Sequence, residues 1–152
     1  MTWRNPFRWR SLAVLAGVLA FTACGGSSAA TPPPSQDVNF TMTAQNGSGV
    51  SGTGQIVQAN GSFTVTIKLT GLANGSSHIS HIHAGKCAAP GGIAYALHQV
   101  VADSTGAATA TTIIPVQYAI PVSGWYVNVH HGPDFTEAGY APSDSCGDLS
   151  AT

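Results

Sequence analysis

From about residue 37 onward, apolar and polar residues alternate along the chain with a period of two. The segments 37–45 and 62–70 show this alternation most clearly. Their apolar positions are Val38, Phe40, Met42, Phe63, Val65, Ile67 and Leu69. Successive side chains of a β-strand point to opposite faces, so each segment predicts a strand with one apolar and one polar face. We find no convincing helical period in this part of the sequence.

Turn signals separate these strands. Asn60 and Gly61 form a two-residue hairpin signal just before the segment 62–70. The sequence "DSTG" at 103–106 predicts a turn between a strand at 93–102 and another at 107–114. A further strand is predicted at 124–131. Seven or eight short antiparallel strands of this kind are typical of an all-β sandwich or barrel.

The first 36 residues have a different character. Three arginines precede a short apolar run at 12–21, which is too short to cross a bilayer and is typical of a secretory signal. The run ends in "FTAC", which resembles a bacterial lipoprotein box with Cys24 as the lipidated residue. We therefore predict a signal peptide at 1–23, a Gly/Ser/Pro-rich tether at 24–36 and a β domain at 37–152, anchored by its lipid to the bacterial cell envelope and facing the periplasm or the exterior. The alternative is an ordinary signal peptide with Cys24 left as a spare thiol.

Charge and cysteine content limit the partners of the predicted domain. It contains two lysines and six acidic residues, a net charge of −4 with neutral histidines. Without a basic patch, we expect no nucleic-acid partner. Of the three cysteines, a lipidated Cys24 would leave Cys87 and Cys146 to pair in an oxidising compartment.

All six histidines of the chain lie between positions 78 and 131. His81 and His83 are two residues apart, so a strand places both on one face. His130 has the polar parity of its own predicted strand. If the two strands are neighbours, the three imidazoles converge, and three nitrogen donors suit copper or zinc. The alternative is that these rings only form hydrogen bonds to loops over the sheet.

The other histidines are weaker candidates. His78 has the opposite parity from His81 and His83, which predicts a structural role. His98, on the predicted strand 93–102, and His131 are possible additional ligands.

Four motifs, "HISHIHAGKC", "VADSTGAAT", "GWYVNVHH" and "CGDL", occur in this order. Together they resemble two related patterns, the copper/zinc superoxide dismutase family and the CHRD domain. The resemblance covers about residues 38–150 and implies a Greek-key antiparallel β-sandwich. The CHRD pattern rests mainly on "HIHAGKCAAPGGIAYAL" and "YVNVHH".

The dismutase resemblance implies roles for individual residues. His81, His83 and His130 match three copper ligands, and His78 matches a structural histidine. Cys87 and Cys146 match a disulfide that ties a loop to the last strand, while Asp103 and Gly106 match a turn between strands.

This sequence departs from the dismutase pattern in ways that bear on catalysis. The histidine that bridges copper and zinc there, and the loop with the other zinc ligands, have no counterpart, since residues 87–97 lead directly into the next strand. Ser143 stands where the dismutase has the arginine that attracts its anionic substrate. We therefore expect a lipid-anchored, non-catalytic CHRD-type domain that binds copper. The alternatives are a copper-only dismutase-like enzyme and a structural or adhesive domain without metal.

Overall fold

A computed structural model of the chain describes residues 38–59 and 61–149. The predicted signal peptide, the tether and Cys24 lie outside the described residues. One short 3-10 turn, η1 (Ala138–Tyr140), interrupts an otherwise all-β fold. The strands are β1 (Val38–Ala44), β2 (Ser51–Ala59), β3 (Ser62–Thr70), β4 (Ser77–His78), β5 (Ser80–Lys86), β6 (Ala89–Ala96), β7 (Val100–Val101), β8 (Ala108–Ile114), β9 (Trp125–His130) and β10 (Ser143–Leu149).

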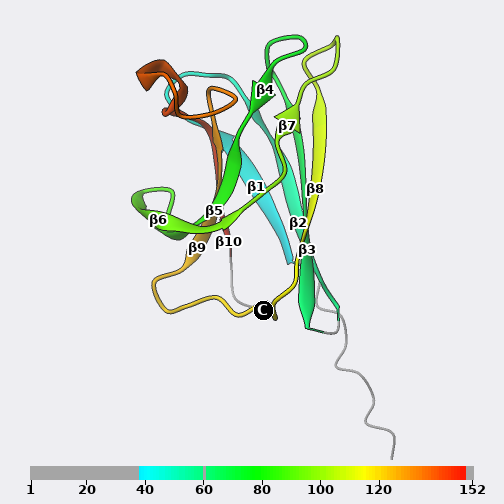
Figure 1. Ribbon diagram of the computed structural model, residues 1–152, viewed down its shortest axis with the longest axis vertical. Coiled ribbons are helices and arrows are strands. Elements are labelled where there is room, and N and C mark those ends of the chain that lie inside the picture. Colours follow the sequence, from blue (N-terminus) through cyan, green and yellow to red (C-terminus); the bar gives the residue numbers. More distant parts are fainter. Residues whose placement is uncertain (1–37, 60, 150–152) are drawn as a thin grey trace, which may run out of the picture. The chain divides into compact units, whose positions relative to one another are not determined.

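Eight of these strands form a curled sheet in the order β6-β5-β9-β10-β1-β2-β3-β8, and β4 pairs with β7. Every pairing is antiparallel. The chain returns twice to a strand it has left, since β8 lies beside β3 and β9 lies beside β5, which is Greek-key connectivity. The group β6-β5-β9-β10 and the group β1-β2-β3-β8 are the two layers of the fold (Figure 1). The predicted all-β sandwich is thus confirmed.

The core lies between the two layers and is built by the alternation seen in the sequence. Buried and accessible residues alternate strictly along most of β1, β3 and β8. Phe63 of β3 is fully buried, and its ring contacts Tyr95 of β6 at 5.9 Å and Trp125 of β9 at 6.2 Å between centroids. These contacts join the two layers, and the opposite faces of β5 and β9 are turned away from this core.

Two predicted turns occur as expected, but one predicted strand does not. Ala59 pairs with Ser62 in the β2–β3 hairpin, and the Asp103 carboxylate accepts backbone hydrogen bonds in the turn before β8. The strand predicted at 93–102 was wrong, because β6 ends at Ala96 and the short β7 begins only at Val100. His98 lies in the gap, where its backbone N–H bonds to the Thr112 hydroxyl on β8 at 2.8 Å. The chain is there crossing from one layer to the other.

A disulfide joins Cys87, just after β5, to Cys146 on β10, with Cα atoms 6.0 Å apart. The sequence-based pairing is therefore confirmed. Among the described residues there is no helix with the length and apolarity needed to span a bilayer.

Candidate metal centre

Three histidines gather on the outward face of β5 and β9. One ring nitrogen from each of His81, His83 and His130 lies within 4.8 Å of the others. The centroids of the His81 and His130 rings are 5.5 Å apart, and those of His81 and His83 are 5.6 Å apart. The predicted convergence of these three imidazoles is confirmed.

Strand register explains why they meet. β5 and β9 are antiparallel neighbours in which His81 is opposite Asn128 and Ile82 is opposite Val127. Ile82 and Val127 are fully buried on the core side. The histidine side chains therefore take the other face, where His130 is the diagonal neighbour of His81.

This outward face is largely buried, because β6 and the segment before β10 cover it. His83 is 9% exposed and His130 is 7% exposed. The Nδ1 of His83 donates to the carbonyl of Gly91 on β6 at 3.0 Å. The Nδ1 of His130 donates to the carbonyl of Ala141, which precedes β10, at 2.7 Å. Because a carbonyl can only accept, both rings carry their proton on Nδ1 and keep a lone pair on Nε2.

Two of the ring nitrogens have no protein partner. Nδ1 of His81 and Nε2 of His83 are both buried without a hydrogen bond. Nε2 of His130 receives only a 3.2 Å contact from the side-chain amide of Asn128. A buried nitrogen without a partner costs about 1–3 kcal/mol, so an arrangement with two of them side by side calls for an explanation.

The surroundings of two of the three rings, those of His81 and His130, favour the neutral form. Burial, reinforced by the nearby rings of His130 and His83, lowers the pKa of His81 to about 4. Burial also lowers the pKa of His130, although its hydrogen bond to Ala141 acts in the opposite direction. Neutral imidazole is the form that binds metal ions, so these shifts reduce competition from protons.

The remaining candidate histidines do not join the group. His98 lies at the surface, with Nδ1 2.8 Å from the carbonyl of Thr111. His131 places Nδ1 3.0 Å from the carboxylate of Asp144. Neither is a fourth member of this cluster.

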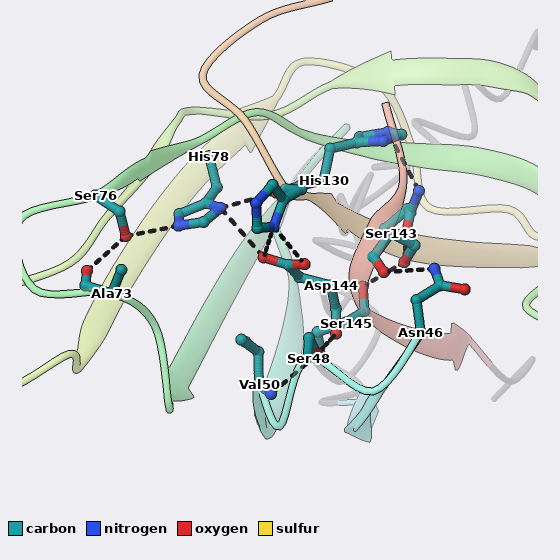
Figure 2. A network of polar contacts seen from close by, with 12 residues as sticks. Asn46, Ser48, Val50, Ala73, Ser76, His78, His130, Ser143, Asp144 and Ser145 are labelled. Carbon is teal, nitrogen blue, oxygen red and sulfur yellow. Dashed lines mark hydrogen bonds and ion pairs between the residues drawn. The ribbon is translucent and has the colours of Figure 1, made fainter. Parts of the chain in front are cut away.

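His78 supports the cluster from the side. It is 3% exposed and donates from Nδ1 to the carbonyl of His130 at 2.8 Å, while its Nε2 lies 2.7 Å from the Ser76 hydroxyl. The buried carboxylate of Asp144 is 3.6 Å from the same Nδ1 (Figure 2). These contacts hold the end of β9, where His130 emerges.

Sequence reasoning missed the residues that surround the three rings. Phe135 stacks on His81 at 5.7 Å, and Tyr126 stacks on His83 at 5.0 Å. Tyr126 could have been found from its polar parity beside Asn128 and His130. Phe135 lies in a loop without periodicity, and the sequence carried no signal for its position.

The donor set fits a transition-metal ion. The group consists of three imidazoles without a carboxylate or thiolate, and two of these rings each have a buried nitrogen without a hydrogen bond. Imidazole suits zinc, copper, iron and nickel, whereas magnesium and calcium prefer oxygen ligands.

Comparison of the sequence with protein-family models and with curated proteins finds no match. The relation to CHRD domains and to the dismutase family therefore stays a prediction from the sequence motifs.

Proposed function

We propose that this chain is a copper-binding protein of the CHRD type, non-catalytic and anchored to the bacterial cell envelope through a lipid on Cys24. The observation that carries the copper-binding part is the pair of buried, unpartnered nitrogens on His81 and His83, beside the Nε2 of His130. A bound ion would satisfy the nitrogens of His81 and His83 and would replace the weak Asn128 contact at the Nε2 of His130. The free-energy cost of burying these nitrogens without hydrogen bonds would then be offset by the metal–ligand bonds.

Copper is favoured over zinc by general affinity. For nitrogen donors, divalent copper stands above zinc in the order of stability. His81, His83 and His130 would hold the ion, with the carbonyls of Gly91 and Ala141 fixing two of the rings from behind. When bound, copper would supply a redox-active centre at the protein surface.

A non-catalytic role is favoured by the residues around the group. Ser143, at the position where the dismutase resemblance implies an arginine, directs its hydroxyl to the side-chain oxygen of Asn128. The β domain has only two lysines against six acidic residues, so its net charge repels a small anion such as superoxide. These features give no means of attracting that substrate.

The test is metal analysis of the purified full-length protein after exposure to copper and zinc together. We expect about one copper ion per chain, and its loss in the His81→Ala/His83→Ala variant. His98→Ala is the matched control, because this exposed histidine lies outside the group and its removal should leave the copper content unchanged. Equal copper contents in the double variant and the control would contradict the proposal.

The copper-loaded protein should also be assayed for superoxide consumption. A rate near the diffusion limit of about 10⁹ M⁻¹s⁻¹, abolished by His130→Ala, would favour the dismutase-like enzyme instead. Failure to retain copper at micromolar concentration would favour the structural or adhesive domain.

A further inference from the structure

Phe135 is an aromatic residue that packs on the histidine group and not in the core. It lies between β9 and β10, and 51% of its surface is exposed. Its ring is nearly parallel to that of His81, 12° at 5.7 Å, and meets the His130 ring edge-on, 82° at 4.9 Å. A half-exposed phenylalanine adds little to folding, so its contact with two of the three histidines points to a role in the site.

Hydrogen bonds fix the loop on both sides of this ring. One carboxylate oxygen of Asp134 accepts from the backbone N–H of Thr136 at 2.8 Å and from its hydroxyl at 2.6 Å. The carbonyl of Pro133 accepts from the side-chain amide of Gln99 at 2.8 Å. The turn formed by Asp134 and Thr136 encloses Phe135, so these bonds fix the backbone that carries the ring.

The Phe135 ring acts as a cap that changes the surroundings of the three-histidine group. Phe135 covers His81 and His130 from one side, and the Tyr126 ring lies on His83 at 5.0 Å and 22°. The group itself contains no carboxylate. The neighbouring buried acid, Asp144, directs its oxygens to His131 at 3.0 Å and to His78 at 3.6 Å.

The cost of placing an ion in such surroundings rises steeply with its charge, and three neutral ligands do nothing to offset it. Divalent ions also retain water ligands more strongly than monovalent copper does. A ring that keeps water from the open side of the group therefore penalises a divalent ion more.

We propose that Phe135 is a specificity-determining residue, whose ring shields the three-histidine group from water and makes it prefer Cu(I) over Cu(II) and Zn(II). This inference rests on the proposed function, because it assumes that copper binds at these histidines. To that function the inference adds the preferred oxidation state of the copper ion and identifies Phe135 as the residue that selects this state.

The test compares the affinities for the two oxidation states in the full-length protein. All variants carry Cys24→Ser, so that no thiol from this position competes for copper. Bicinchoninate serves as the competing ligand for Cu(I) and nitrilotriacetate for Cu(II). We expect Phe135→Ala to reduce the ratio of Cu(I) to Cu(II) affinity about tenfold, the lower end of the effect of residues surrounding a metal site. A tenfold change corresponds to about 59 mV in reduction potential.

Two further variants define the cause. Ile113→Ala is the matched control, since it removes a 67% exposed apolar side chain on β8, away from the histidines. Asp134→Ala keeps the Phe135 side chain but removes the turn bonds to Thr136 that position its backbone, and should lower the ratio by less than Phe135→Ala. Water-proton relaxation by the Cu(II)-loaded protein should rise in Phe135→Ala and stay unchanged in Ile113→Ala.

The outcomes separate the cap from the copper site itself. If the parent protein and Phe135→Ala bind copper through the histidines with the same ratio and the same relaxation, the cap is refuted and copper binding stands. If the parent protein retains neither ion, the proposed function fails and the cap fails with it. Thermal unfolding of Phe135→Ala within a few degrees of the parent excludes misfolding as the cause.

Discussion

Removing the Cys87–Cys146 disulfide is the most direct test of how the site is held together. The bond ties the residue that follows β5, the strand carrying His81 and His83, to β10. Cys146 is 4% exposed and lies opposite Thr43 on β1 and Asn128 on β9. A Cys87→Ala/Cys146→Ala double variant removes the bond without leaving a buried thiol or a new polar group.

The expected cost follows from the length of the closed loop. The two cysteines are separated by 59 residues. In the chain-entropy model, opening a loop of this length lowers the free energy of unfolding by about 4 kcal/mol. For a domain of this size that corresponds to a fall of roughly 10 to 20 °C in the unfolding midpoint.

Equilibrium unfolding in guanidinium chloride, followed by tryptophan fluorescence, measures the change. Cys24→Ala is the control, because this cysteine is outside the disulfide and its removal should leave the free energy of unfolding unchanged. A loss below about 1 kcal/mol in the double variant would refute the loop-entropy reasoning. Two alkylatable thiols at Cys87 and Cys146 in the native, unreduced protein would refute the bond itself.

Three other perturbations test separate parts of the description. The pKa of His81 is 6.5 in its ordinary state and is lowered to about 4 in the folded state, so the unfolded chain binds more protons between these values. The free energy of unfolding should therefore fall between pH 7 and pH 4, by about 1 kcal/mol from this partly solvent-screened ring. A free energy of unfolding that does not change with pH in this window would contradict the assignment. Gly54→Ala should destabilise the fold by about 1–3 kcal/mol in chemical denaturation, since a Cβ there would lie 1.9 Å from the Phe40 ring, whereas Gly92→Ala meets nothing within 4 Å and should be neutral. Cys24→Ser should release the protein from the membrane fraction on centrifugation; a variant that still sediments with membranes would show the predicted lipid anchor to be wrong.

Local sequence pattern determined several of the strands and the faces of the site residues. Alternation at Phe63 and its neighbours fixed which side of β3 is buried, because side chains in a strand have a period of two. The same rule put His81 and His83 on one face and gave His130 the polar parity of its strand. These are properties of a few consecutive residues and need no knowledge of the rest of the fold.

Only the tertiary structure decided which of these faces meet and what covers them. The pairing of β5 with β9 joins segments more than 40 residues apart, and its choice depends on how the whole chain packs its apolar faces. Burial, which depends on that packing, sets the low pKa of His81. His98 lies outside any strand because the chain crosses between the layers there. Phe135 reaches the site from a loop that is held by side-chain hydrogen bonds such as that of Asp134 to Thr136. Such contacts have no period along the chain, so a sequence pattern cannot predict them.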